Sequence, residues 1–134
     1  YLLFLRPTEN RIAKDLNDKK IPFVIISDDL RHVLLARKQG YMAYFGHLDK
    51  LPVLESLKVD EASSVIITVS DTHIKRLICE AVLKFHKNAN ILLKIESLDE
   101  KAQLKDLDIK KFVHAHFEVG RLLVQEAMLS LENK

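Results

Sequence analysis

The chain has 134 residues, of which 48% are hydrophobic, and this suits one compact domain with a sizeable core. Its 21 basic and 19 acidic residues leave a formal charge of +2 and are interspersed along the sequence, without the basic stripe that nucleic acid requires. We therefore expect a single domain over residues 1–134 that has no nucleic-acid partner.

The N-terminal segment is predicted to form a strand, a tight loop and a helix. Residues 2–5 are all apolar, as expected of a short buried strand. Ile12, Ala13 and Leu16 then recur at the spacing of one helical face, which predicts a helix that ends near Lys20.

A complete strand, helix and strand unit follows over residues 21–46. Residues 23–26 form a short apolar run rich in β-branched residues, which predicts a strand covered on both faces. Asp28 and Asp29 end this strand and can cap the next helix, which Gly40 stops. The expected inward face of that helix consists of Leu30, Val33, Leu34 and the stem of Arg37. A third strand is predicted over residues 42–45.

The middle of the chain contains the run with the strongest strand pattern. Gly46 and His47 lead into a short helix that tolerates Pro52 in its first turn. The side chains expected to face inward from this helix are those of Val53, Leu54 and Leu57. Residues 64–69, with the sequence SVIITV, predict a strand at the centre of the sheet.

The next predicted helix has the clearest periodicity. Ser70, Asp71 and Thr72 offer capping oxygens at its start. Its expected buried stripe consists of Ile74, Leu77, Ile78, Ala81, Val82 and Phe85. Residues 90–95 predict a fifth strand.

The remaining elements are two helices and one strand. Ser97 and Glu100 form a capping box that predicts a helix reaching about Leu107. Residues 111–114 predict a sixth strand. The last helix, over residues 117–131, is apolar on more than one side, which favours a contact with another subunit.

Strands that alternate with helices at intervals of about 20 to 25 residues predict a layered α/β fold. A strand joined to a parallel neighbour through a helix crosses over with a right hand. The predicted fold class is therefore α/β, with a doubly wound, parallel, six-stranded, Rossmann-like sheet.

Five segments carry a family resemblance: IPFVIISDD, ARKQGYMAYFG, LDKLPVLESLKVDEASSVIITVSD, ILLKIES and FVHAHFEVGRLL. In order and spacing they resemble the regulator-of-potassium-conductance (RCK) domain, also called KTN or TrkA-N, of prokaryotic potassium channels and transporters. The resemblance covers nearly the whole chain. It implies a cytosolic module that forms dimers or rings, binds nucleotides or ions, and transmits ligand occupancy to a membrane pore. Because the sequence begins at Tyr1 without a methionine, we expect residues 1–134 to be an RCK N-lobe-like fragment of a longer membrane protein.

The nucleotide-binding motif departs from the pattern that this fold usually carries. In GxGxxG the missing side chains let backbone amides approach the pyrophosphate. The corresponding positions here are Phe4, Arg6 and Glu9, and Glu9 places negative charge where a phosphate would bind. The family's usual acidic position after the second strand is occupied by Ser27, with Asp28 one residue later. We therefore expect NAD or an adenine nucleotide to bind weakly or not at all.

The expected ligand crevice lies at the carboxyl ends of the strands. Its candidate cofactor-binding residues are Arg6, Glu9, Asp28, Asp29, His47, Ser70 and Asp71, and no catalytic residue is expected. Several of these residues have an equally simple structural role. Arg6 and Arg11 could hold a phosphate by charge but are favoured as solvated side chains. The residues that follow strands can all be helix caps: Asp28, Asp29, Ser70 and Asp71.

The sequence favours neither a metal site nor a reactive thiol. His114 and His116 share one face of a segment predicted to be extended, and could bind a metal with His47 or Asp71, but they lack the ligand spacing of a zinc site. Cys79 is the only cysteine, which excludes an internal disulfide, and it is expected to be buried and inert.

Three functions remain open at this point. The first is a non-enzymatic regulatory domain of a potassium channel or transporter, whose partners are further copies of itself and a membrane pore domain. The second is a peripheral nucleotide-binding subunit of a potassium uptake system. The third, a small NAD-dependent oxidoreductase, is disfavoured because the glycine motif is absent and no room is left for a substrate domain.

Overall fold

A computed structural model describes residues 2–5, 10–47, 50–56 and 58–132. Its strands, in chain order, are β1 (Leu2–Leu5), β2 (Phe23–Ser27), β3 (Ala43–Phe45), β4 (Ser64–Ile67), β5 (Ile91–Ile95) and β6 (Lys111–His114). Its helices are α1 (Asn10–Asp18), α2 (Leu30–Lys38), α3 (Leu51–Ser56), a 3-10 turn η1 (Val59–Glu61), α4 (Thr72–Phe85), α5 (Leu98–Gln103) and α6 (Ala115–Glu132).

Within the described residues the strands form one 6-stranded sheet in the order β3-β2-β1-β4-β5-β6. Every pair of neighbours is parallel. The predicted parallel, Rossmann-like α/β fold is therefore confirmed. β4 pairs with β1 on one side and with β5 on the other, as its apolar, β-branched sequence predicted.

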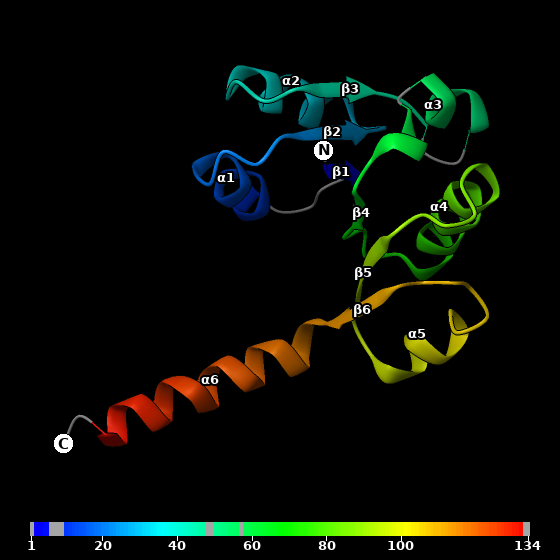
Figure 1. Cartoon of the computed structure of the whole chain (residues 1–134). Coiled ribbons are helices and arrows are strands. Elements are labelled where there is room, and N and C mark those ends of the chain that lie inside the picture. Colours follow the sequence, from blue (N-terminus) through cyan, green and yellow to red (C-terminus); the bar gives the residue numbers. More distant parts are fainter. Residues whose placement is uncertain (1, 6–9, 48–49, 57, 133–134) are drawn as a thin grey trace.

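The helices form two layers around the sheet (Figure 1). α1 and α2 lie on one face over β1–β3, and α3, α4 and α5 lie on the other. The smaller core, under α1 and α2, is built from Ala13, Phe23, Ile25, Val33, Ala36 and Ala43. The larger core, under α4 and α5, is built from twelve residues, including Ile67, Ile78, Val82, Leu93 and Leu104. Each fully buried aliphatic side chain of this kind stabilises the fold by about 1.5–3 kcal/mol.

The prediction for the inward face of α2 is confirmed for Val33 and is wrong for Leu30 and Leu34. Val33 and Ala36 are buried, whereas Leu30 is 54% exposed and Leu34 is 56% exposed. The Asp29 side chain caps the helix at Arg31, and this start places Val33 and Ala36 toward Phe23 and Ile25. The stem of Arg37 also does not face the core. Its guanidinium instead donates a hydrogen bond of 2.8 Å to the carbonyl oxygen of Ala43 on β3.

Two further helix predictions need correction. Leu77 of α4 is exposed, and the buried stripe of that helix runs through Lys75, Ile78, Cys79 and Val82. α5 ends at Gln103, and not near Leu107. Its end is fixed by Leu104, which is fully buried and whose amide closes the last turn on the carbonyl of Glu100.

α6 leaves the sheet after β6 and extends away from the other elements (Figure 1). None of its residues is buried. Among the described residues, no helix combines the length and the apolar character that crossing a bilayer requires.

Candidate ligand-binding site

The strand order reverses between β1 and β4, and ligands of open α/β sheets bind beyond the carboxyl ends of the strands at this point. Leu5 at the end of β1 is in register with Ile26 of β2 and Ile67 of β4. The predicted contributors Arg6 and Glu9 lie outside the described residues. The structure therefore describes the two flanks of the crevice, which follow β2 and β4.

On the β2 flank the chain turns tightly at Ser27. This side chain is fully buried, and its Oγ accepts a hydrogen bond of 3.0 Å from the amide of Asp29. The Ser27 carbonyl accepts another of 3.0 Å from the amide of Gly46, which follows β3. A Cβ on Gly46 would lie 2.9 Å from Cγ1 of Val53, so this close approach requires glycine. The Ser27 hydroxyl thus stabilises the turn between β2 and α2.

Asp29 is the N-cap of α2. Its Oδ1 accepts a hydrogen bond of 3.0 Å from the amide of Arg31, and its Oδ2 lies 3.3 Å from Nη2 of Arg31 and 3.8 Å from Nε2 of His32. The side-chain hydrogen bond from Arg31 lowers the pKa of Asp29, and the backbone hydrogen bond acts in the same direction against a partial loss of hydration. The carboxylate is therefore ionised and held by its own helix. Asp28 beside it is half-buried.

His47 follows β3 and is exposed. Its ring lies 5.9 Å from the ring of Phe45, centroid to centroid, in an edge-to-face arrangement. The structure thus places His47 beside Gly46 on the β2 flank of the crevice.

On the β4 flank Thr68 and Val69 are buried, and Ser70 and Asp71 emerge at the surface. Oδ1 of Asp71 accepts a hydrogen bond of 2.9 Å from the amide of Ile74 and so caps α4. The predicted capping role of Asp71 is confirmed. On each flank a carboxylate thus accepts a hydrogen bond from one of the free amides at a helix N-terminus, a position that otherwise attracts an anion.

A buried ion pair near this edge was not predicted from the sequence. Lys75 of α4 is fully buried, and its Nζ contacts Oε1 of Glu100 in α5 and donates a hydrogen bond of 2.8 Å to the carbonyl of Lys94 in β5. Oε2 of Glu100 accepts a hydrogen bond of 2.7 Å from the Thr72 hydroxyl. The pair therefore ties the start of α4 to the start of α5, beside the β4 flank.

The capping box predicted for Ser97 and Glu100 is formed in one direction. Oγ of Ser97 accepts a hydrogen bond of 3.1 Å from the amide of Glu100. The Glu100 carboxylate, however, turns to Lys75 and Thr72 and accepts a longer bond of 3.3 Å from the amide of Glu96. One signal for this existed in the sequence, because Lys75 falls on the apolar stripe with Ile78, Cys79 and Val82.

The predicted histidine pair has a structural role in the connection between β6 and α6. His114 ends β6 but His116 belongs to α6, so the two do not share an extended segment. Nδ1 of His114 accepts a hydrogen bond of 3.1 Å from the amide of Phe117. The rings of His114 and Phe117 stack with their centroids 4.0 Å apart. Within the described part of the chain, no group of three His, Cys, Asp or Glu residues could hold a metal ion.

Cys79 is fully buried in the larger core, as predicted. Burial raises the pKa of its thiol to about 12. The thiol is therefore protonated at neutral pH and is a poor nucleophile.

Several solved structures have a similar fold. It is similar to the TrkA-N domain of the inner membrane protein YbaL from Escherichia coli, with a TM-score of 0.82 and 17% identity over 93% of this chain and 94% of that one. It is also similar to the NAD(P)-binding domain of an exopolyphosphatase-related protein from Archaeoglobus fulgidus, with a TM-score of 0.85 and 15% identity over 94% and 96%. A third similar structure is the GsuK channel bound to NAD, with a TM-score of 0.76 and 19% identity over 84% of this chain but only 21% of that one.

At these identities the structures establish the fold alone. The sequence profile of the TrkA-N domain matches residues 10–115, which span the elements from α1 to the start of α6. This match agrees with the family resemblance noted in the sequence. The chain therefore belongs to the TrkA-N domain family, the N-terminal domain of RCK modules.

Proposed function

We propose that the chain is a regulatory, ligand-sensing and assembly domain on the cytoplasmic side of a potassium channel or transporter, and that it is not an enzyme. Membership of the TrkA-N family is the observation that carries this proposal. Two similar proteins support it, since one is a channel and the other belongs to an inner membrane protein. Residues 1–134 would then act as one domain of a longer assembly, with further copies of the chain and a membrane pore as partners.

NAD binding is proposed to be weakened or lost. The chain has three glycines, at positions 40, 46 and 120, so none lies in the turn that joins β1 to α1. In that turn every residue carries a side chain where backbone amides would otherwise contact a pyrophosphate. Asp29 and Asp71 support the same view, because each already caps the helix N-terminus on its flank of the crevice.

Regulation would work through a shift between two arrangements of the subunits. A ligand in the crevice, next to Asp28, His47 and Asp71, changes the gate only to the extent that it binds one arrangement more tightly than the other. Without such a ligand, the domain would serve as a scaffold for assembly. Neither mode requires chemistry on the ligand.

Isothermal titration of the chain with NAD, NADH, ATP and ADP tests this proposal. We expect dissociation constants no tighter than about 0.1 mM for each nucleotide. The variant Glu9→Lys is expected to bind about tenfold more tightly, because it replaces a negative charge near the phosphates with a positive one. Glu55→Lys on α3 makes the same change in charge at an exposed site and should leave the affinity unchanged.

Submicromolar binding of NAD by the unmodified chain would overturn the proposal of a weakened site. Such binding would be compatible both with a channel domain and with the second candidate, a peripheral nucleotide-binding subunit, because one similar structure is a channel bound to NAD. An oxidoreductase would additionally have to transfer hydride to or from the bound nucleotide. This would be measured as a change in absorbance of NADH with a panel of hydroxy and keto acids.

A further inference from the structure

The direction of α6 depends on its junction with β6. The helix extends away from the rest of the domain, and none of its residues is buried (Figure 1). Among the described elements, the one that α6 contacts most closely is β6, the strand that leads into it. The first turn of α6 is therefore the part that can hold the helix in place.

His114 caps this first turn. It ends β6, and Nδ1 of its half-buried ring accepts a hydrogen bond of 3.1 Å from the amide of Phe117, the third residue of α6. Such an amide has no carbonyl partner within its own helix, and an N-cap side chain usually offers it an oxygen. In this chain a ring nitrogen takes the place of that oxygen.

The hydrogen bond requires a neutral imidazole. A neutral ring has one bare nitrogen that can accept, whereas both nitrogens of an imidazolium carry protons and donate. A protonated His114 would therefore direct an N–H group at the amide of Phe117, which is also a donor. It would also place a positive charge at a helix N-terminus, where the helix dipole favours a negative one. The stacking of the two rings does not prevent this change, because a cation can also pack on an aromatic face.

The titratable groups on α6 do not compensate a charge on His114. The ring of His116 lies 6.0 Å from the His114 ring, centroid to centroid, so its protonation would add a like charge. The Glu118 carboxylate accepts a hydrogen bond of 2.9 Å from the Arg121 guanidinium. The nearest carboxylate on the helix is thus already engaged by a cation.

The neighbouring elements give the same result. Glu96, which follows β5, has its carboxylate 3.4 Å from the Lys94 ammonium. On the α5 side, the Lys101 ammonium lies 5.6 Å from the ring centroid of Phe112, two residues before His114 on the same face of β6. The surroundings of His114 therefore contain as much positive as negative charge.

We propose that the junction of β6 and α6 is a pH-sensitive joint, in which neutral His114 fixes the first turn of α6 and protonated His114 releases it. Histidines change charge between about pH 5 and pH 8, so the joint responds within the range that cells reach. The joint is a property of the fold and does not depend on the proposed function. Because the apolar residues of α6 are exposed, the direction of the helix decides which surface they can meet.

NMR spectra of the chain between about pH 7.5 and pH 5 test the joint. At the higher pH the ¹⁵N shifts of the His114 ring should show Nδ1 without a proton. As the ring takes up a proton, the ratio of frayed to helical conformers at residues 115–118, read from ¹³Cα shifts, should rise about fivefold, the usual effect of removing an N-cap. Residual dipolar couplings of residues 119–131 should then lose the alignment that they share with the sheet.

Three variants separate the cap from other effects of pH. His114→Asn keeps an acceptor at the N-cap and does not titrate, so the first turn should stay helical at both pH values. His114→Ala removes the acceptor and should fray at the higher pH as the unmodified chain does at the lower one. His116→Asn is the matched control, because it removes an exposed histidine two residues away and should leave the pH response in place.

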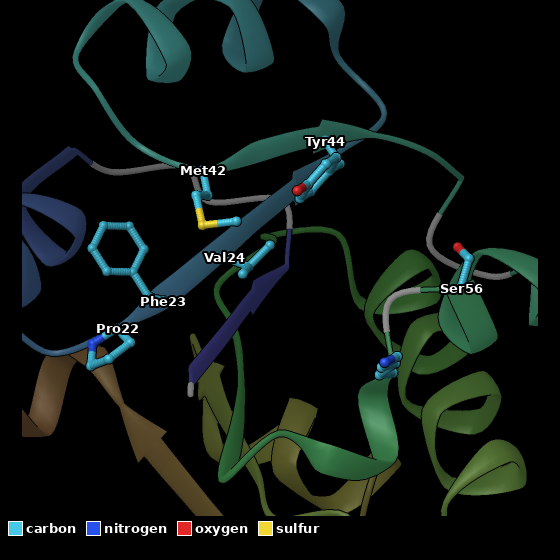
Figure 2. A pocket seen from close by; sticks show the side chains of 7 residues that line it. Pro22, Phe23, Val24, Met42, Tyr44 and Ser56 are labelled. Carbon is cyan, nitrogen blue, oxygen red and sulfur yellow. The ribbon is translucent and has the colours of Figure 1, made fainter.

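A cavity at the other edge of the sheet supplies an internal reference. It has a volume of about 560 Å³ and lies at the amino ends of β2 and β3, where Figure 2 shows Pro22, Phe23 and Met42 among its lining. His114 lies at the carboxyl end of β6, and all neighbouring strands of the sheet are parallel. None of the described lining residues is a histidine. The amides of residues 22–24 and 42 should therefore keep their shifts across the titration.

Several results would overturn the joint. The proposal would be wrong if Nδ1 of His114 carried the proton at the higher pH, or if the first turn of α6 kept its helical shifts at the lower one. It would also be wrong if the pH response persisted in His114→Asn or disappeared in His116→Asn. Shifts of the cavity amides in step with those of the first turn would show a change of the whole domain in place of a local release.

Discussion

Replacing Glu100 with alanine is expected to lower the free energy of unfolding by about 3–5 kcal/mol, because it leaves a buried ammonium without its anion. Lys75 is fully buried, and the Lys94 carbonyl at 2.8 Å would be the remaining partner among its described hydrogen bonds. The Thr72 hydroxyl would lose its acceptor as well. Urea unfolding followed by circular dichroism measures the change.

Two controls separate burial from the mere presence of a charge pair. Arg76 of α4 and Asp106, in the turn that follows α5, also form an ion pair, but the Asp106 side chain is 61% exposed. Asp106→Ala should therefore cost no more than about 1 kcal/mol. The double variant Lys75→Met with Glu100→Leu removes both buried charges and should recover most of the lost stability. Equal losses for Glu100→Ala and Asp106→Ala would contradict the prediction.

Lowering the pH is expected to weaken the same ion pair between Lys75 and Glu100. Burial alone would raise the pKa of Glu100, but the hydrogen bonds from Lys75 and Thr72 outweigh it and hold the pKa below 4.5. Near that pH the folded chain therefore binds fewer protons than the unfolded chain, so the stability that the pair contributes is full well above 4.5 and falls as the pH drops toward and below it. Glu100→Gln does not titrate. The stability difference between the unmodified chain and this variant should shrink between about pH 6 and pH 3 in urea titrations.

Asp29 and Asp106 also have lowered pKa values, each held down chiefly by its arginine neighbour. Both aspartates are present in the unmodified chain and in Glu100→Gln. The effect of their titration therefore cancels in the stability difference between the two proteins. A stability difference that stays constant over this pH range would show that Glu100 keeps an ordinary pKa in the folded chain.

The features that were best predicted from the sequence are those that depend on residues close together in the chain. The strand runs are recognisable because short, β-branched segments such as residues 64–67 suit a sheet buried on both faces. The N-caps Asp29, Asp71 and Ser97 were predicted correctly, since each bond joins a side chain to an amide two or three residues later.

Features that depend on contacts between residues far apart in the sequence could not be predicted. Leu30 and Leu34 were expected to face the core, but α2 turns its small residue Ala36 and its β-branched Val33 toward the sheet. Lys75 sits in an apolar stripe, yet its anion lies 25 residues away and is brought close only by the packing of α4 on α5. In a capping box the Glu100 carboxylate would bind near the start of its own helix. Here it contacts Lys75 and Thr72 of α4 instead.

Aspartates on α6 are expected to dissociate the chain into monomers. Phe117, Val124, Met128 and Leu131 recur at the spacing of one side of this helix, and Val119, Leu122 and Leu129 at the spacing of the opposite side. All seven are exposed. The double variants Val124→Asp with Met128→Asp and Leu122→Asp with Leu129→Asp should each weaken self-association about 100-fold, because a buried carboxylate without a partner is costly. Sedimentation velocity over a range of protein concentrations measures this.

The control for added charge is Asn17→Asp with Asn88→Asp, which introduces two carboxylates at exposed positions outside α6 and should leave the association unchanged. A monomeric unmodified chain, or equal weakening by this control, would refute the role of α6.

A second copy is the partner that the chain itself suggests for α6. Leu92 of β5 and Val113 of β6 lie on the sheet face opposite the larger core, and Val113 is exposed there. α4 and α5 cover the other face, and α6 extends away from this one (Figure 1). Exposed apolar residues that gather on one face mark interaction surfaces. Because one side of α6 can rest on such a sheet face while the other side stays free, loss of association by only one double variant would identify the side that meets the partner. Loss by both would place α6 between two surfaces, the arrangement needed for one copy to pass a change in packing to the next.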